Sequence, residues 1–293
     1  MRSAQARERL FYAQKIKCFS ICKKNFTLHA LCYIIFALAF LRFFKKTAII
    51  FRLRTYFMKS RLTADSWILT RPIAHRGLWT EELAENSMSA YKAAIVHNYP
   101  IEMDVQMSKD GVLYCFHDDN MKRMTGADID IREADSTEIE KLKIGGEHIP
   151  TFDEFLRLVK GQVPILIEIK KQKYKGVEQK VLDALKGYTG ELAIQSFDPT
   201  VMLKIKKLDK TILRGQLGVK MTTMSRFNNF VVTNLALNFL VRPDFVHYYH
   251  ECLPLKRRIS NGLPVICYTI QNKEQENRAR KYVKNFVFDH YEA

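Results

Sequence analysis

Acidic and basic side chains recur at alternate positions within two apolar segments of the chain. Glu102 and Asp104 lie two residues apart in IEMDVQM, and Glu168 and Lys170 have the same spacing in PILIEIK. Alternate residues of a β-strand lie on one face, so each pair would point the same way if these segments are strands. Three carboxylates without a sulfur ligand suit Mg²⁺ or Ca²⁺, because these hard cations prefer oxygen donors. We therefore predict one divalent cation, Mg²⁺ or Ca²⁺, bound by Glu102, Asp104 and Glu168.

Two histidines and an arginine lie at the ends of further apolar segments. His75 and Arg76 follow PIA, and His117 follows VLYCF. Because histidine exchanges a proton near neutral pH, His75 and His117 form a candidate acid–base pair. Arg76 and Lys170 supply positive charge suited to an anionic group such as phosphate. These residue types indicate a site that cleaves phosphodiesters, and the chain contains no GxxxxGK[ST] or GxGxxG phosphate loop of the nucleotide-binding proteins.

The elements that must position these residues alternate between short apolar runs and helical stretches from about Thr63 onward. This alternation is typical of βα units around a parallel sheet. Strands are predicted at 72–75, 101–107, 112–118, 164–170, 192–197, 211–218, 244–250 and 264–270, and a short apolar run at 285–289 closes the chain. Helices are predicted at 87–97, 177–186, 199–208 and 273–282. Eight such units indicate a TIM-type β/α barrel, with a doubly wound open sheet as the alternative.

The polar stretch 119–160 is predicted to be an insertion after the third strand. Each candidate functional residue lies toward the carboxyl end of a predicted strand. Barrels of this type build their active sites at that end, from several strands at once. We therefore expect the histidines, the cations and the carboxylates to meet at the mouth of the barrel.

The ordered motifs that carry this chemistry resemble the glycerophosphodiester phosphodiesterase family. They are HRG at 75–77, ENS at 85–87, EMD at 102–104, HD at 117–118 and EIK at 168–170. The resemblance covers about residues 71–290 and continues through MKRMTG, IPTFDEFL and QSFD. It implies a β/α barrel that hydrolyses deacylated phospholipids to sn-glycerol 3-phosphate and an alcohol.

The resemblance also implies a role for each matching residue. Glu102, Asp104 and Glu168 would hold the metal, with His75 and His117 as the catalytic acid and base, and Arg76 and Lys170 would contact phosphate. In the family's mechanism the glycerol 2-hydroxyl attacks phosphorus, and water then opens the cyclic phosphate. Two alternatives remain open: a phospholipase-like enzyme acting on intact lipids, and a non-catalytic barrel used for binding.

Three further residues are predicted to line the substrate site. Glu85 and Asn86 would shape the mouth, although Asn86 could instead cap the helix that begins near Ser87. Tyr268 stands where the family often has tryptophan on the eighth strand, followed here by Thr269. Tyrosine in place of tryptophan would keep an aromatic wall beside the substrate.

The charge of the chain is concentrated in a basic N-terminal extension. The net charge is +16, and residues 1–62 hold 14 lysines and arginines against one acid, Glu8. The rest of the chain is nearly neutral, so we expect no nucleic-acid partner. We predict two domains, the extension at 1–62 and the barrel at 63–293.

Within the extension, residues 25–41 (NFTLHALCYIIFALAFL) carry no formal charge and are followed by Arg42. A run of this length is at the short end of what spans a bilayer, and basic flanks suit an anchor. We predict a single-pass membrane anchor at 25–44. If translation instead begins at Met58, the protein would be cytoplasmic.

Overall fold

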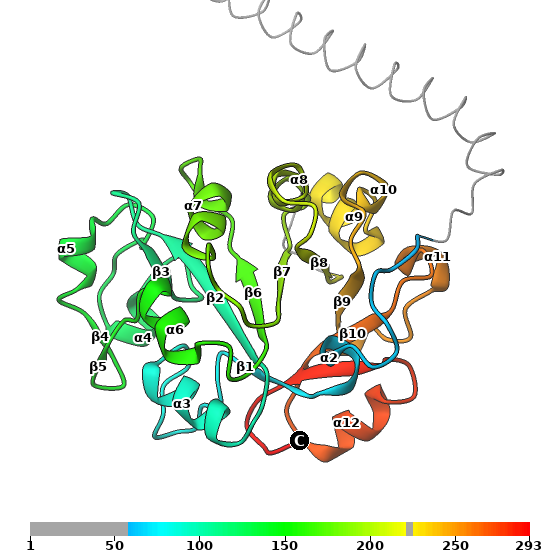
Figure 1. The fold of residues 1–293 in the computed structure, drawn as a ribbon, viewed down its shortest axis with the longest axis horizontal. Coiled ribbons are helices and arrows are strands. Elements are labelled where there is room, and N and C mark those ends of the chain that lie inside the picture. Colours follow the sequence, from blue (N-terminus) through cyan, green and yellow to red (C-terminus); the bar gives the residue numbers. More distant parts are fainter. Residues whose placement is uncertain (1–57, 221–224) are drawn as a thin grey trace, which may run out of the picture. The chain divides into compact units, whose positions relative to one another are not determined.

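The barrel of this protein consists of eight parallel strands that close on themselves (Figure 1). The structure, a computed structural model, describes residues 58–220 and 225–293. The strands are paired in the order β1 (Ile73–His75), β2 (Ile101–Met107), β6 (Ile165–Ile169), β7 (Leu192–Ser196), β8 (Leu213–Gly218), β9 (Phe245–Tyr249), β10 (Val265–Ile270) and β11 (Asn285–Phe288). β11 pairs in turn with β1, so the predicted TIM-type barrel is confirmed and the open sheet is excluded.

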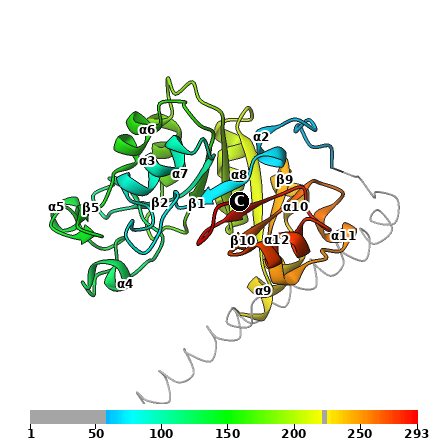
Figure 2. The same ribbon diagram turned by 90° about the horizontal axis from the view of Figure 1, so that it is seen from below.

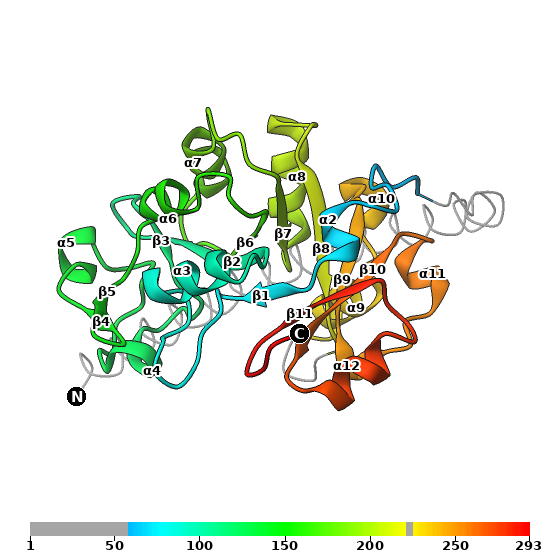
Figure 3. The ribbon, with the colours of Figure 1, turned by 60° about the horizontal axis from the view of Figure 1, so that its bottom comes forward.

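The prediction of a barrel strand at 112–118 was wrong. Its ordered part, β3 (Leu113–Cys115), pairs with β2 in the antiparallel direction. Only residues 108–112 connect the two strands, whereas a crossover between parallel strands needs a dozen residues or more. Gly111 has a φ of +91°, which suits this tight turn. The eighth barrel strand is β11, so the last strand of the chain lies beside the first (Figure 3).

Helices fill most of the connections between barrel strands. The longer ones are α3 (Met88–Val96), α6 (Phe152–Val159), α7 (Val177–Ala184), α8 (Pro199–Leu208), α9 (Arg226–Asn234) and α12 (Lys273–Ala279). Short elements are α2 (Trp67–Thr70), α10 (Asn238–Val241), η1 (His250–Cys252) and α11 (Arg257–Ser260). The four predicted helices are confirmed as α3, α7, α8 and α12, with ends that differ by a few residues. α6 begins at a capping box in which Thr151 and Glu154 satisfy each other's backbone N–H groups.

The segment between β3 and α6 forms a small lobe at one side of the barrel. It contains α4 (Lys122–Thr125), α5 (Ser136–Ile139), β4 (Lys143–Ile144) and β5 (Glu147–His148), which lie together beyond β3 and away from β9 and β10 (Figures 1 and 2). Ile131, Ile139 and Ile144 are buried in its own apolar cluster. α6 instead buries Phe152 and Phe155 in the main core, so the lobe ends before α6 although the predicted insertion extended to residue 160.

Residues 58–62 contact the barrel, although the sequence analysis assigned them to the extension. Arg61 donates from Nε and Nη2 to both carboxylate oxygens of the buried Asp244, each at 2.7 Å, and Ser60 donates to the Asp244 carbonyl. In the described part of the chain, no helix combines the length and the apolar character needed to cross a membrane. The predicted anchor at 25–44 lies outside the described residues and stays a prediction.

Candidate active site

Three buried carboxylates meet on one face of two neighbouring strands. β2 and β6 pair in parallel with Asp104 opposite Glu168, and Glu102 precedes Asp104 on the same face. One oxygen of each of the three side chains lies within 4.8 Å of the others. Gln195, from β7, donates to Glu102 Oε1 at 3.4 Å. The predicted triad is therefore assembled, and it offers three oxygen donors to a single point.

The charges around this triad favour the binding of a further cation. Burial and the neighbouring carboxylates of Asp104 and Glu168 raise the pKa of Glu102 well above its ordinary value. Burial also acts against the charged form of Asp104, but the Lys170 ammonium and the neighbouring His117 and Arg76 outweigh it and hold its pKa low. Arg76 and Lys170 supply two positive charges beside three acidic side chains. A bound divalent ion would therefore let all three carboxylates ionise.

Arg76 reaches this cluster from a tight turn at the end of β1. Arg76 and Gly77 have φ values of +59° and +83°, so the backbone reverses immediately after His75. A Cβ on Gly77 would meet the Ala90 carbonyl carbon at 2.8 Å, so glycine allows this close approach. Arg76 Nη1 donates to Glu85 Oε1 at 2.8 Å, and its Nε lies 3.2 Å from Asp104 Oδ2.

Asn86 lies in the site and does not cap the helix. The cap of α3 is Ser87, whose side chain accepts from the Ala90 amide, so the capping alternative for Asn86 was wrong. Asn86 Nδ2 donates to Asp104 Oδ2 at 3.1 Å, and its Oδ1 accepts from the Tyr91 hydroxyl at 2.8 Å. Asn86 therefore orients a carboxylate of the triad while Tyr91 fixes the amide.

Lys170 extends from the end of β6 into the same cluster. Its ammonium lies 2.8 Å from Glu168 Oε1 and 3.4 Å from Asp104 Oδ1. Burial alone would lower the pKa of Lys170, but the two carboxylates outweigh it and raise that pKa, so Lys170 stays charged. Arg76 and Lys170 thus present positive charge on either side of the triad.

His75 is held by a carboxylate from the last barrel strand. Its Nδ1 lies 2.7 Å from Asp289 Oδ2, and the carboxylate, as acceptor, requires the proton on Nδ1. The ring is largely buried, and burial together with nearby Arg76 lowers the pKa of His75 although Asp289 opposes this. A neutral His75 with its proton on Nδ1 has a free lone pair on Nε2, the atom available to take a proton.

His117 lies in the loop after β3 and is oriented differently. Its Nδ1 lies 2.6 Å from Asp118 Oδ1, and Gln106 from β2 donates to the carbonyls of both residues. Arg123, on α4 of the lobe, binds both Asp118 oxygens and also donates to Glu85. Burial disfavours the charged form of Glu85, but Arg123 and Arg76 outweigh it and lower its pKa.

Tyr268, on β10, packs among other aromatic rings. Its ring lies edge-on to Phe197 at 6.1 Å and to His247 at 4.7 Å between centroids, and it is tilted against Tyr249 at 5.9 Å. The hydroxyl donates to the Gly218 carbonyl at 3.0 Å, which fixes the ring. The role of this ring beside the substrate stays a prediction.

Residues 75–292 match the family model described as the glycerophosphoryl diester phosphodiesterase family. The chain belongs to this family. A curated glycerophosphodiester phosphodiesterase from Caldanaerobacter subterraneus is 34% identical over 230 residues, which cover 72% of this chain and 90% of that protein. Another, from Bacillus subtilis, is 26% identical over 261 residues, covering 80% of this chain and 87% of the relative.

Solved structures support the fold. A phosphodiesterase from Oleispira antarctica, in complex with the product sn-glycerol-3-phosphate, has a TM-score of 0.63 at 22% identity and covers 76% of this chain and 94% of its own. A putative glycerophosphoryl diester phosphodiesterase from Agrobacterium tumefaciens has a TM-score of 0.65 at 19% identity, with 75% and 93% covered. These relatives share the barrel over nearly their whole length.

Several residues of this family member's site escaped the sequence analysis. Asp289 was not predicted, because the run 285–289 was not among the predicted barrel strands and its place beside β1 was therefore not expected. Arg123 lies in the lobe, and no local pattern shows that it reaches Glu85. Gln195 belongs to QSFD, and its position on β7 opposite Glu168 is the signal that could identify it.

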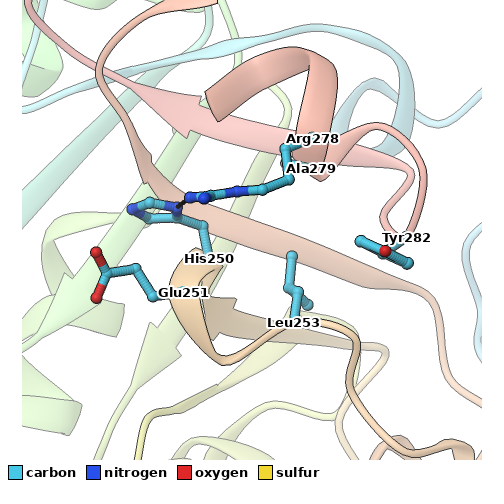
Figure 4. Close-up of a pocket in the computed structure, with 6 residues that line it drawn as sticks. All are labelled: His250, Glu251, Leu253, Arg278, Ala279 and Tyr282. Atoms are coloured by element: carbon cyan, nitrogen blue, oxygen red, sulfur yellow. Dashed lines mark hydrogen bonds between the residues drawn. The ribbon is translucent and has the colours of Figure 1, made fainter. Parts of the chain in front are cut away.

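A separate cavity of about 270 Å³ lies between η1 and α12 (Figure 4). It is lined by His250, Glu251, Leu253, Arg278, Ala279 and Tyr282. The Arg278 guanidinium lies against the His250 ring, with Nη2 3.5 Å from Nδ1. None of the predicted site residues lines this cavity, so it is distinct from the carboxylate cluster.

Proposed function

We propose that this protein hydrolyses glycerophosphodiesters to sn-glycerol 3-phosphate and an alcohol, with one divalent cation and two histidines as proton carriers. Its family membership supports the reaction class, phosphodiester hydrolysis. The curated relatives named above are glycerophosphodiester phosphodiesterases, and one fold relative was solved with sn-glycerol-3-phosphate. The single observation that carries the proposal is the convergence of the carboxylate triad with Arg76 and Lys170 at one end of the barrel.

The residues present fit a resident divalent cation. Glu102, Asp104 and Glu168 would hold it, because they offer only oxygen donors and carry more negative charge than the fixed cations around them offset. When bound, such an ion stabilises negative charge on a phosphoryl oxygen. Mg²⁺ and Ca²⁺ both suit this donor set.

The protein's own groups supply substrate binding and proton transfer. Arg76 and Lys170 would bind the phosphate oxygens that point away from the triad. One histidine takes the proton of the glycerol 2-hydroxyl as that oxygen bonds to phosphorus, and the other protonates the departing alcohol oxygen. In the second half, water attacks the cyclic phosphate, gives its proton to the second histidine, and the first returns its proton to the 2-oxygen. Both histidines end in their starting state.

The experiment that tests this proposal follows products from several substrates with the full-length chain. Glycerophosphocholine, glycerophosphoethanolamine, glycerophosphoglycerol and lysophosphatidylcholine are incubated with Mg²⁺ or Ca²⁺. sn-Glycerol 3-phosphate is measured as the product of the deacylated diesters, and lysophosphatidate as the product of the lysophospholipid, whose acyl chain stays on the glycerol. We expect product from the deacylated diesters. Product from the lysophospholipid alone would favour the lipid-acting alternative, and no product from any substrate would contradict the proposal.

A further inference from the structure

The closure of the barrel brings one acidic residue, Asp289, directly against a proposed proton carrier. β1 and β11 pair in parallel with Ala74 opposite Phe288, so His75 and Asp289 are the next residues along each strand. Their contact, 2.7 Å from Nδ1 to Oδ2, joins two points 214 residues apart in the chain. The geometry therefore depends on the strand pairing itself and not on a flexible loop.

The Asp289 carboxylate is held in place by other groups. Its backbone amide donates to the Ile270 carbonyl at 3.0 Å. Its second oxygen, Oδ1, accepts from Gln271 Nε2 at 3.1 Å. The side chain is only 4% exposed, so water does not compete strongly for it.

The charge of Asp289 is directed mainly at His75. Gln271, which also contacts the Asp289 carboxylate, is uncharged. Among the described residues, the next side-chain nitrogen is His290 Nε2, which lies 3.8 Å from Asp289 Oδ1. Asp118, the partner of His117, differs because Arg123 binds both of its oxygens. The carboxylate that contacts His117 is therefore shared with an arginine, whereas the carboxylate that contacts His75 is not.

We propose that Asp289 is the positioning residue of His75, holding its proton on Nδ1 so that Nε2 carries the reacting proton. This inference rests on the function proposed above. When Nε2 gains the substrate proton, the ring becomes an imidazolium whose positive charge lies 2.7 Å from a carboxylate. When the proton leaves, the ring returns to the Nδ1–H tautomer. In this proposal Asp289 acts only through His75.

The first arm of the test is kinetic. Asp289→Asn keeps the shape but removes the charge, and we expect kcat to fall about 10- to 1,000-fold with KM changed less than about threefold. This loss is smaller than the roughly 10²–10⁴-fold expected when a general acid or base itself is removed. In a His75→Ala background the same substitution should cost less than about threefold, because the partner it positions is gone. Glu292→Gln, an exposed acid next to His97, is the matched control and should keep full activity.

The second arm needs no substrate. In full-length protein labelled with ¹⁵N-histidine, we expect a slowly exchanging, downfield Nδ1 proton that disappears in both His75→Ala and Asp289→Asn. If that proton survives in Asp289→Asn, or if the Asp289→Asn loss is as large without His75 as with it, the positioning role is wrong. A wild-type chain that shows the proton but hydrolyses no glycerophosphodiester would contradict the proposed function and leave the His75–Asp289 pair standing.

Discussion

The Lys170 ammonium lies 2.8 Å from Glu168 Oε1, two positions away on the same strand end. It is also 3.4 Å from Asp104 Oδ1, so one side chain lies against two of the three proposed metal ligands. Lys170 therefore offsets part of the triad's charge, and we propose that it also presents a cation to the phosphate group of the substrate.

Replacing Lys170 by alanine should lower kcat/KM for a glycerophosphodiester about 10- to 100-fold. The expected size follows from the loss of a charge-assisted contact of about 1.5–3 kcal/mol. Lys171→Ala is the matched control, because Lys171 is the next residue, carries the same charge and is exposed. Equal loss in both variants would show that general basicity of this loop, and not the position of Lys170, supports activity.

The two histidines should each be required for turnover. His75→Ala and His117→Ala are expected to lower kcat about 10²–10⁴-fold, the usual contribution of a general acid or base. Both variants should fold, because each side chain is partly exposed, 16% for His75 and 34% for His117. His97→Ala, an exposed histidine outside the mouth, serves as the control. Near-native kcat in either mouth variant would remove that histidine from the mechanism.

The sequence was sufficient to predict most of this site because the site lies on strands. Glu102 and Asp104, like Glu168 and Lys170, follow from the two-residue period alone, and the structure brings both pairs together. Glu168 and Lys170 lie at the end of β6, and the pairing of Asp104 with Glu168 brings the β2 carboxylates to the same level of the barrel.

What escaped prediction depends on long-range pairing or on turn length. Asp289 becomes meaningful only when β11 is known to close the barrel beside β1. β3 has the composition of a barrel strand, but the short connection 108–112 forces it to run back along β2. Arg123 also binds Glu85, 38 residues earlier, and this contact depends on how the lobe packs, which no local pattern encodes.

Acidification should destabilise the fold partly through His247. Burial lowers the pKa of His247 to about 3, against an ordinary value of 6.5. Between these values the unfolded chain binds a proton at this residue and the folded chain does not, so this contribution to stability is complete above about pH 6.5 and is lost as pH falls toward 3. The slope from one such group is at most about 1.4 kcal/mol per pH unit.

Urea unfolding midpoints measured from pH 7 to pH 4 test this contribution. His247→Gln should lose less stability over that range than the wild type, although it is less stable at pH 7 because the contact of His247 Nδ1 with Gln195 is changed. Parallel pH dependence in the two proteins would mean that His247 is not the group responsible.

The N-terminal extension should be separable from catalysis. We propose that residues 25–44 anchor the full-length chain in a membrane, and that deletion of residues 1–57 leaves activity on water-soluble substrates unchanged. The cut is placed before Met58 because Arg61 is bound to the buried Asp244, and a deletion through residue 62 should lower the unfolding midpoint. Membrane fractionation of both chains tests the anchor. Full-length protein found entirely outside the membrane fraction would contradict it.

Removal and return of metal shows whether the carboxylate triad works with a divalent cation. Full-length enzyme treated with EDTA and then freed of chelator should be inactive on glycerophosphodiesters, and Mg²⁺ or Ca²⁺ should restore its activity. Asp104→Asn, which removes one charge from the triad with little change in shape, should require a much higher metal concentration for half-maximal activity. Full turnover by rigorously metal-free wild-type enzyme would contradict the account.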